Sequence, residues 1–469
     1  MDFSSILTMK FEMMLTGIIF ILLFIKIDGR MGNTSLLRLT NILLFVNFVL
    51  GFFGNSESSL FGDSFRTNHL LGLEKNILNL ATLIISLTSY EWLKKHNHLP
   101  EFFILLLSSL LGLFFMMSSG NLLMFYLGLE LSTIPLAALC NFDLEKRISG
   151  EAAMKMIMSS AFSSAILLFG ISMMYGTTGT ISFAEIPAAL VGSQLQILAF
   201  VLLFTGFAFK LSVVPFHLWT ADVYEGSPIA VTAFLSVVSK GAMSFVFITA
   251  LYKVFAPMAQ TWYWALAVTA AITMTVGNLF AIRQQNLKRF FAFSSIAQVG
   301  YLLIGISSAS QIGIASVVYF ILIYVFSNLA AFGVIGIISS HTGKETLNEY
   351  RGLYKSNPTL ALVMALALFS LAGIPPTAGF FGKLFLLTTG AAMGTWWLIV
   401  VAALNMIISL YYYLRIIRVM FVDESSEPLP KLSLATSVFV ALAVCVVGIL
   451  VIGFASRTFD VIFNLSANL

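Results

Sequence analysis

The chain has 469 residues, of which 59% are hydrophobic and only 10% are charged, and its mean hydropathy is +0.96. Soluble domains contain about 45–50% apolar and about 25% charged residues, so this composition excludes a soluble globular domain and indicates an all-α polytopic membrane protein. The net charge of +4 comes mainly from loop lysines and arginines and does not indicate a nucleic-acid partner.

Apolar segments long enough to cross a bilayer, at about 20 residues each, use up most of the length. Fourteen transmembrane helices are predicted, at residues 13–27, 36–54, 76–93, 101–119, 121–140, 151–175, 195–219, 227–252, 260–281, 291–308, 311–340, 358–390, 393–421 and 432–455. The first segment lacks a small-residue cleavage site, so we expect it to be retained as a span.

The loop charges predict the orientation of these helices. Only five loop lysines and arginines lie on the side that would hold both termini, namely Lys10, Arg66, Lys75, Lys253 and Arg457. The others lie in the loops after odd-numbered helices, although the connection after the seventh helix carries none. Because cytoplasmic loops carry an excess of Lys and Arg, both termini are predicted on the outer side.

Motifs for redox cofactors and nucleotides are missing from the sequence. The two cysteines, Cys140 and Cys445, fall in or at the ends of apolar spans, and an iron–sulfur cluster needs about four thiolates. There is also no CxxC, GxGxxG or P-loop. We therefore expect no redox cofactor, metal or nucleotide in this chain.

Two predicted spans are interrupted by proline. Pro215 lies in the seventh, and Pro375 and Pro376 lie in the twelfth. Proline removes an amide donor and clashes with the carbonyl one turn back, and in lipid the freed carbonyls need partners inside the protein or beside water. The twelfth stretch would also be about 50 Å long as one helix, which a break resolves.

The two breaks occupy matching positions of two units. Broken helices at corresponding places in two halves are typical of inverted-repeat transporters. We predict inverted five-helix repeats of helices four to eight and nine to thirteen, each with its broken helix in fourth place. The resulting domains are 1–100 (three helices), 101–255 and 256–421 (the repeats, one half-channel each) and 422–469 (the last helix). The alternative is that Pro and Gly are simply commoner in membrane helices.

Four ionisable residues lie inside apolar stretches: Glu130, Lys210, Lys240 and Lys383. A charge at the bilayer centre costs about 2.5–3.5 kcal/mol, so four would cost about 10–14 kcal/mol, and such groups mark ion or proton paths by default. All four are predicted at one depth, as a row parallel to the membrane. Burial favours a neutral lysine and a nearby carboxylate favours the charged form, so Glu130 beside Lys210 would hold a proton. A static ion pair would explain these two residues but not the two further lysines.

Other polar positions have two interpretations each. His217, Asp222 and Glu225 could gate proton access, or the two acids could cap the next helix. A second group could hold water between Lys240 and Lys383 or form ordinary interhelical hydrogen bonds: Ser294, Ser295, Gln298, Tyr319, Tyr324, Ser327 and Asn328. His341 is predicted at the cytoplasmic end of the eleventh helix, as an exit group or without a role.

Several of these motifs together resemble a known family. They are Pro215-Phe216-His217-Leu218-Trp219-Thr220 and Asp222-Val223-Tyr224-Glu225-Gly226 between Lys210 and Lys240, then Asn286-Leu287-Lys288-Arg289, Ser294-Ser295-Ile296, and Ser370 to Lys383. The chain resembles the antiporter-like proton-pumping subunits of respiratory complex I over residues 100–420. It is most similar to the subunit N branch, also called subunit 2. Subunit L has a lateral helix for which this chain has no room, and subunit M typically has a glutamate at the position of Lys383.

The resemblance implies a role for each buried group. Glu130 and Lys210 would be the pair of the first half-channel, Lys240 the connecting lysine and Lys383 the lysine of the second half-channel. Ala221 and Ile229-Ala230 depart from the family pattern near the start of the eighth helix.

The resemblance also implies a setting. Protons would be translocated by this subunit of an NADH–quinone oxidoreductase, driven by quinone reduction elsewhere in the complex. NADH, FMN, iron–sulfur clusters and quinone would bind partner subunits, subunits K and M would be neighbours, and the lipid bilayer would be a bacterial inner membrane with both termini periplasmic.

Three alternatives remain at this point. The chain could be a subunit of a multi-subunit cation/proton antiporter, the membrane arm of a related hydrogenase or dehydrogenase, or a structural scaffold. Partners that co-purify would separate the first two from complex I. A scaffold predicts that neutralising the buried lysines does no harm.

Overall fold

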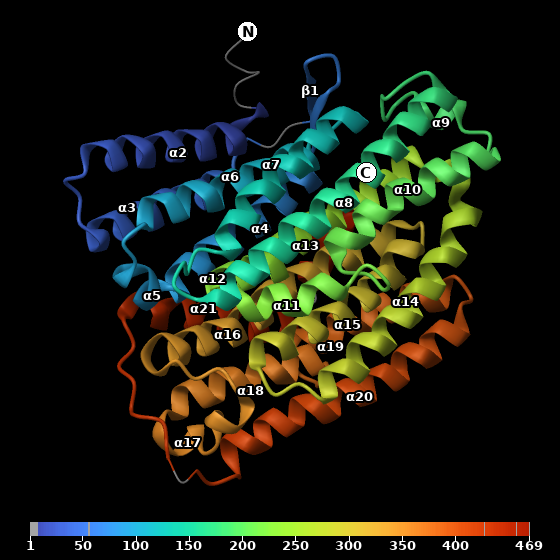
Figure 1. Ribbon diagram of the computed structural model, residues 1–469. Helices are drawn as coiled ribbons and strands as arrows, with labels where there is room; N and C mark the ends of the chain where they lie inside the picture. The colour runs from blue at the N-terminus through green and yellow to red at the C-terminus, as the bar shows by residue number, and fades with distance from the viewer. Residues whose placement is uncertain (1–7, 55–56, 426, 456, 469) are drawn as a thin grey trace.

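The computed structural model describes residues 8–54, 57–425, 427–455 and 457–468. Helices packed side by side make up nearly all of it (Figure 1). Among the described residues, 12 helical stretches are long and apolar enough to cross a membrane, and Pro358–Ala372 and Ala378–Ala392 are shorter apolar helices. The polytopic all-helical class is confirmed.

The N-terminal part packs two outer helices against a buried third. In chain order it contains α2 (Lys10–Asp28), α3 (Asn33–Leu50), β1 (Ser58–Leu60), β2 (Phe65–Thr67), α4 (His69–Thr88) and α5 (Tyr90–Lys95). The strands form an antiparallel hairpin, which the sequence analysis did not predict. β2 continues into a bridge between Phe65 and Ser119, so the hairpin covers the end of the bundle where α4 begins.

The first predicted repeat follows. It contains α6 (Leu99–Met117), α7 (Leu122–Cys140), α8 (Arg147–Thr178), α9 (Ile186–Ala189), α10 (Gln194–Leu211), α11 (Leu218–Gly226), α12 (Ile229–Phe234), the π-helix η1 (Leu235–Ser239), α13 (Lys240–Thr249), the π-helix η2 (Ala250–Val254) and the 3-10 turn η3 (Ala256–Met258). The predicted seventh helix is divided into α10 and α11, as the proline indicated.

The second predicted repeat and the C-terminal part complete the chain. They contain α14 (Ala259–Ile282), α15 (Leu287–Ser307), α16 (Gln311–Thr342), η4 (Leu347–Tyr350), α17 (Leu353–Ser356), α18 (Pro358–Ala372), α19 (Ala378–Ala392), α20 (Trp396–Phe421), α21 (Thr436–Phe454), α22 (Arg457–Leu465) and η5 (Ser466–Asn468). The predicted twelfth helix is divided into α18 and α19, so both predicted breaks are confirmed.

The two repeats use the same parts in the same order. Each begins with a closely packed helix pair, α6 with α7 and α14 with α15. Glycines allow this approach, since a β-carbon on Gly128 would lie 2.5 Å from the Met116 nitrogen and one on Gly277 would lie 2.6 Å from the Ala297 nitrogen. The third helices, α8 and α16, both have 32 residues, and the fourth helix is broken in both units. The exact domain boundaries remain a prediction.

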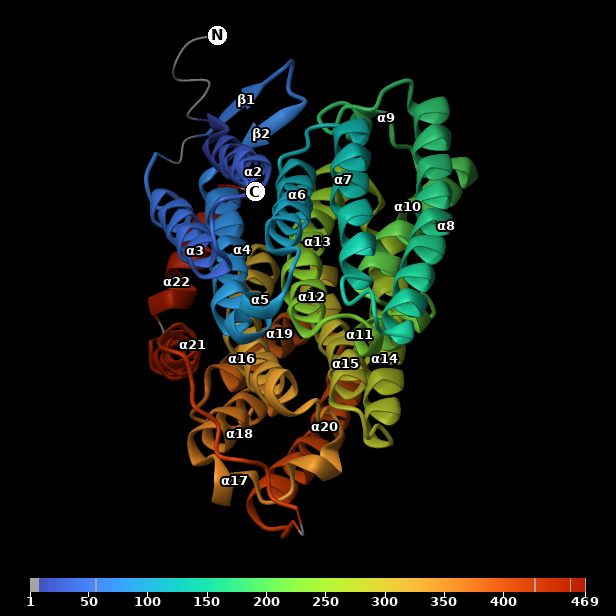
Figure 2. The same cartoon turned by 60° about the vertical axis from the view of Figure 1, so that its left-hand side comes forward.

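The most buried helices lie at the centre of the bundle. The spans containing α13 and α15 are 100% buried, whereas α3 is 28% buried and α8 is 33% buried. Figure 2 shows α15 and α16 inside, with α3, α21 and α8 at the periphery. The outer helices expose large apolar side chains such as Phe162, as expected for surfaces that face lipid.

The third helix begins earlier than predicted. The sequence analysis placed its start at residue 76, but α4 begins at His69, where the Asn68 side chain accepts a hydrogen bond from the Leu71 amide at 2.7 Å. Asparagine is a strong helix N-cap. Lys75, assigned above to a loop, is therefore inside a helix and only 1% exposed, so the count of three lysines in apolar interiors was wrong.

Candidate functional site

Three of the four predicted buried charges are lysines in the interior, and helix packing places them in a series. Lys210 and Lys240 are each 3% exposed and Lys383 is 1% exposed. They lie on α10, α13 and α19, and α10 packs against α13, α13 against α15, and α15 against α19. The helix α15, which carries no lysine or arginine beyond its first turn, therefore separates Lys240 from Lys383.

The first group centres on Lys210. Its Nζ donates a hydrogen bond of 2.5 Å to Thr133 Oγ1 on α7. Thr133 in turn donates to the Leu129 carbonyl at 2.6 Å, so its oxygen is oriented to accept from the lysine. Thr133 was not singled out from the sequence, although it stands one helical turn after Glu130 and so shares its face.

Glu130 does not form the expected direct pair with Lys210. Its side chain is half-buried, and its Oε1 is buried with no hydrogen-bond partner among the described residues. No ion pair within 4.0 Å joins it to Lys210 in the described chain, because the lysine ends at Thr133, one turn away. The arrangement leaves a buried carboxylate oxygen free to accept a proton or a water molecule.

If the chain pumps protons within a complex, as the resemblance implies, Thr133→Val should lower pumping several-fold without preventing assembly. Valine keeps the shape of the side chain but cannot accept the bond from Lys210, and a hydrogen bond to a charged group contributes about 1.5–3 kcal/mol. Proton uptake by vesicles containing the whole complex measures this. Thr133→Ser, which keeps the hydroxyl, is the matched control, and equal pumping by the Val and Ser variants would contradict the role of Thr133.

Lys240 follows a local change in helix geometry. The π-helix Leu235–Ser239 directly precedes it, and such π-bulges occur frequently at functional sites. The Lys240 Nζ donates to Ser295 Oγ at 2.8 Å and lies 5.5 Å from the centre of the Tyr224 ring. Ser295 on α15, predicted to hold water or form hydrogen bonds between Lys240 and Lys383, thus contacts Lys240 directly.

Two other predicted polar residues meet one turn before Lys240. Ser236, in the π-helix, lies 3.1 Å from the Tyr324 hydroxyl and accepts a bond of 3.1 Å from Asn328. A cavity of about 10 Å³ borders Lys240, Ser295, Gln298, Ser236 and Tyr324 among its lining residues. That volume suits about one water molecule. By contrast, the Tyr319 hydroxyl donates to the Ile452 carbonyl, an ordinary interhelical bond.

The second helix break supplies the partners of Lys383. Its Nζ donates to the Leu371 carbonyl at 2.8 Å and to the Ala372 carbonyl at 3.2 Å. These carbonyls end α18, where no following helical amide can satisfy them. Gln298 donates to the same Leu371 carbonyl at 3.1 Å, so one backbone oxygen joins α15 to Lys383. The Gln298 Oε1 is buried without a partner among the described residues.

Further hydroxyls complete this region. Ser294 lies 2.5 Å from the Tyr413 hydroxyl of α20, and Ser327 donates to Ser370 at 2.7 Å. Ser295, which accepts from Lys240, and Gln298, which shares the Leu371 carbonyl with Lys383, stand three residues apart on α15 and so share a face. The interpretation of this group as a water-holding connection fits the contacts, but the alternative of interhelical bonding also describes Ser327 and Tyr319.

The acids after the first break form ion pairs. Asp222 bonds Arg289 and Lys155, each at 2.6 Å, and Glu225 bonds Arg289 at 2.9 Å. α12 begins after Pro228 without a side-chain cap, so the capping alternative was wrong. The pKa of Asp222 is lowered because, although desolvation by burial raises it, hydrogen bonds from Lys155 and Arg289 outweigh that effect.

The two predicted histidines lie apart from these acids. His217 is 8% exposed, and its Nδ1 has no partner among the described residues. No hydrogen bond or ion pair within the described chain joins it to Asp222 or Glu225. His341 is exposed in the last turn of α16, where its Nδ1 lies 2.9 Å from the Ile337 carbonyl.

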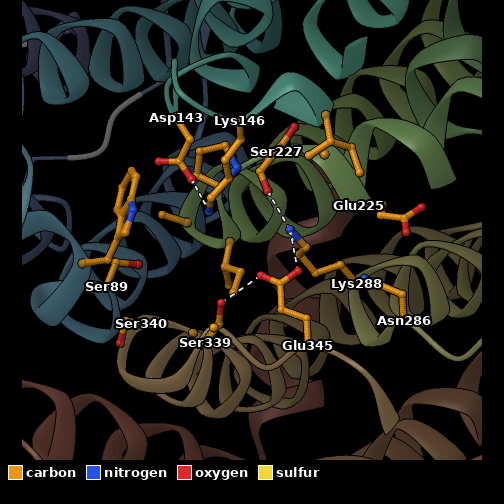
Figure 3. A pocket seen from close by; sticks show the side chains of 18 of the residues that line it. Ser89, Asp143, Lys146, Glu225, Ser227, Asn286, Lys288, Ser339, Ser340 and Glu345 are labelled. Carbon is orange, nitrogen blue, oxygen red and sulfur yellow. Dashed lines mark hydrogen bonds and ion pairs between the residues drawn. The ribbon is translucent and has the colours of Figure 1, made fainter. Parts of the chain in front are cut away.

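A cavity of about 440 Å³ opens where α11 meets α12, next to α5 and the end of α16 (Figure 3). In it Lys288 pairs with Glu345 at 3.0 Å and donates to the Ser227 carbonyl at 3.2 Å, and Ser339 donates to Glu345 at 2.8 Å. Lys288 is only 6% exposed. Sequence reasoning counted it as a loop lysine, because its partner Glu345 is distant in the sequence.

Among the described residues, no three His, Cys, Asp or Glu side chains come together in a metal-binding arrangement. Cys140 and Cys445 are both buried free thiols, and they lie on different helices, α7 and α21.

A bundle with two broken helices and a series of buried lysines defines a membrane subunit of the antiporter-like class. The sequence model of the family described as NADH:quinone oxidoreductase/Mrp antiporter, TM, matches residues 119–409. Two curated relatives named NADH-quinone oxidoreductase subunit N are similar over nearly their full length. The one from Phocaeicola vulgatus is 46% identical and covers 98% of this chain and 99% of its own. The one from Azobacteroides pseudotrichonymphae is 43% identical and covers 99% of each chain. The chain belongs to the NADH-quinone oxidoreductase subunit N family.

Solved structures agree with this family. A chain of respiratory complex I from Thermus thermophilus has a TM-score of 0.81 at 28% identity, covering 94% of this chain and 96% of that one. A chain of the Mrp complex from Dietzia sp. DQ12-45-1b has a TM-score of 0.85 at 21% identity, covering 100% and 98%. The second similarity shows a shared fold alone.

Proposed function

We propose that this chain is a proton-translocating membrane-arm subunit of an NADH–quinone oxidoreductase. The observation that carries this is the unbroken series of helix contacts that joins Lys210, Lys240 and Lys383 through α13 and α15. In this proposal Glu130 and Lys210 form the first half-channel, Lys240 connects, and Lys383 serves the second. Family membership supports the assignment of the host complex.

The energies of the observed contacts suit this task. Moving one proton against 100 mV costs about 2.3 kcal/mol, and one hydrogen bond to a charged group contributes about 1.5–3 kcal/mol. Exchanging the Lys210–Thr133 bond or the Lys240–Ser295 bond for another partner is therefore enough to drive a proton step. A charge arriving at Lys240 would repel one at Lys383, and the shared Leu371 carbonyl provides a route for that coupling.

The second helix break explains why Lys383 can be held without a carboxylate partner. Lys383 is stabilised by the carbonyl end of α18, where the helix dipole is negative. When the break changes shape, those two carbonyls would move relative to Lys383 and change its proton affinity. Driven by quinone reduction elsewhere, such a movement would couple redox energy to this subunit.

The proposal places the redox chemistry in other subunits. NADH, FMN, iron–sulfur clusters and quinone would bind partner subunits, and subunits K and M would be the neighbours of this chain in the membrane arm. The chain would lie in a bacterial inner membrane with both termini periplasmic, as the loop charges predict. Its share in the enzyme would be translocation alone.

A cation/proton antiporter subunit is the main alternative, since the Mrp chain has the same fold. The chain is 46% identical to a subunit N relative but only 21% identical to the Mrp chain, and this difference favours an NADH–quinone oxidoreductase subunit over an antiporter subunit. A hydrogenase-type or other dehydrogenase membrane arm is the second alternative.

Affinity purification of the tagged chain from its own membranes tests the proposal. We expect flavin and iron–sulfur subunits to co-purify, with NADH–quinone reductase activity that acidifies the lumen of inside-out vesicles. Co-purification of antiporter subunits without flavin would contradict the proposal.

A further inference from the structure

A second set of buried charges lies apart from the row described above. Glu12 on α2 and Glu74 and Lys75 on α4 are 1%, 3% and 1% exposed, respectively. We call these three residues the N-terminal charge cluster. They lie within the first two turns of their helices, near the β1–β2 hairpin (Figure 2), whereas Thr88 at the other end of α4 lines the cavity of Figure 3.

Within this cluster, Lys75 and Glu12 satisfy each other. The Lys75 Nζ lies 2.5 Å from Glu12 Oε1 and donates to Ser118 Oγ at 2.6 Å. The rings of Phe11, Phe65 and Phe114 surround the ammonium, with centres 5.2–5.8 Å away. Aromatic faces attract a cation, so Lys75 is held as a charged partner of Glu12. An ion pair that anchors α2 to α4 explains these two residues.

Glu74 is the residue that such an anchor leaves unexplained. It is only 3% exposed, yet it has no hydrogen bond, and no ion pair within 4.0 Å, to any described residue. Its side chain lines a cavity of about 330 Å³. The charged residues that share this lining are Glu57, Arg66 and Lys253. A further lysine, Lys10 on α2, lies near Lys75 of α4. The cluster thus holds one surplus carboxylate, and that carboxylate faces a cavity large enough for several water molecules.

The position of Glu74 relates this cavity to Lys240. Leu78, one turn after Glu74 on the same face of α4, lies 3.2 Å from the place that a β-carbon would take on Gly241. Gly241 directly follows Lys240. Thr249, at the end of α13, lines the cavity with Glu74. Glu74 therefore lies about one turn, or about 5.4 Å along the helix, from the level of Lys240 toward the cavity.

We propose that Glu74 is a further proton-binding site, which exchanges protons between Lys240 and the water of the hairpin-side cavity. The Lys240 ammonium loses a proton and becomes an amine, the Glu74 carboxylate gains it by way of intervening water, and the resulting carboxylic acid releases it to a cavity water molecule. This inference rests on the proposed function and adds to it an outlet on the side of the chain termini.

The test uses the whole complex reconstituted in vesicles, with proton pumping measured against NADH oxidation. We expect Glu74→Gln to lower the number of protons pumped per NADH to less than half of the wild-type value. Glu427→Gln is the matched control, because it makes the same change at an exposed glutamate outside the cavity lining, and it should pump normally. Normal pumping by Glu74→Gln would overturn the inference.

An infrared readout separates proton binding from a structural role. The difference spectrum between low and high pH should contain a band of a protonated buried carboxylic acid that Glu74→Gln lacks and Glu427→Gln keeps. The same band in Glu74→Gln would overturn the inference. This outcome differs from a failure of the proposed function itself. If the chain did not translocate protons through its lysines, Lys210→Met would pump normally as well.

A second variant keeps the test valid if Glu74→Gln does not assemble. Thr249→Trp would fill the cavity from α13 and leave all three cluster residues unchanged. We expect it to slow pumping while the rate of NADH oxidation with an uncoupler stays normal. Coupled pumping at the wild-type rate in the assembled Thr249→Trp complex would overturn the inference.

Discussion

A complex that carries Lys210→Met is expected to assemble normally and to pump protons at least about tenfold more slowly than the wild type. Methionine has a similar length and suits a buried site, so packing on α10 should survive. The variant removes the ammonium that donates a hydrogen bond to Thr133. A hydrogen bond to a charged group contributes about 1.5–3 kcal/mol, and each 1.4 kcal/mol corresponds to about a tenfold change.

Glu130→Gln should reduce pumping in the same direction. Glutamine keeps the shape of the side chain but removes the negative charge that favours a proton on Lys210. Since Lys210 bonds Thr133, and no ion pair within 4.0 Å joins it to Glu130 among the described residues, this effect acts through space and should be smaller than that of Lys210→Met. The measurement is quenching of a pH-sensitive dye in vesicles, normalised to NADH oxidation.

A surface lysine provides the control for this pair. Lys355 has a side chain that is 67% exposed and is paired with Glu424 at 2.6 Å, and surface pairs contribute little. Lys355→Met should therefore pump like the wild type. If Lys210→Met and Glu130→Gln both assemble and pump normally, the relay along these residues is wrong.

The positions of the helices could be predicted from the sequence because bilayer-spanning segments are long and strongly apolar. Pro215 and Pro375 located both breaks, since a proline in a membrane helix must leave carbonyls without amide partners. The π-helices at Leu235–Ser239 and Ala250–Val254 could not be predicted. They depend on how α12 and α13 pack, and no local residue pattern signals them.

The candidate site could be predicted only where its charges stand alone in apolar sequence. Lys210, Lys240 and Lys383 have this property. Lys75 does not, because Glu74 precedes it and the two together resemble a solvated helix end. Its partner Glu12 is 63 residues away in sequence, and Lys288 likewise pairs with the distant Glu345. A residue's burial depends on such partners, which a reading of neighbours in sequence does not find.

Gly379→Ala is expected to have the second large effect, on assembly. A β-carbon at this position would lie 1.7 Å from the Ser370 carbonyl oxygen and 2.6 Å from the Ser370 carbonyl carbon. Both are backbone atoms, so no side-chain rotation relieves the clash. Overpacking of this kind costs about 1–3 kcal/mol or more, and here α18 and α19 would have to separate.

The separation would act directly on the second half-channel. The Gly379 amide donates to Ser370 Oγ at 3.2 Å, and Lys383, one turn further along α19, bonds the Leu371 and Ala372 carbonyls just beyond Ser370. Native gels should show reduced assembly, and any complex that forms should melt at a lower temperature and pump poorly.

Gly176→Ala distinguishes this effect from a general sensitivity to helical glycine. It places the same methyl group on α8, where nothing lies within 4 Å of the new β-carbon, and alanine is the better helix former by about 1 kcal/mol. This variant should be as stable as the wild type or more so. If Gly379→Ala also assembled and pumped like the wild type, the close contact between the two halves of the broken helix would not be needed to hold Lys383. The coupling would then have to reach Lys383 from α15, through Gln298 and the Leu371 carbonyl.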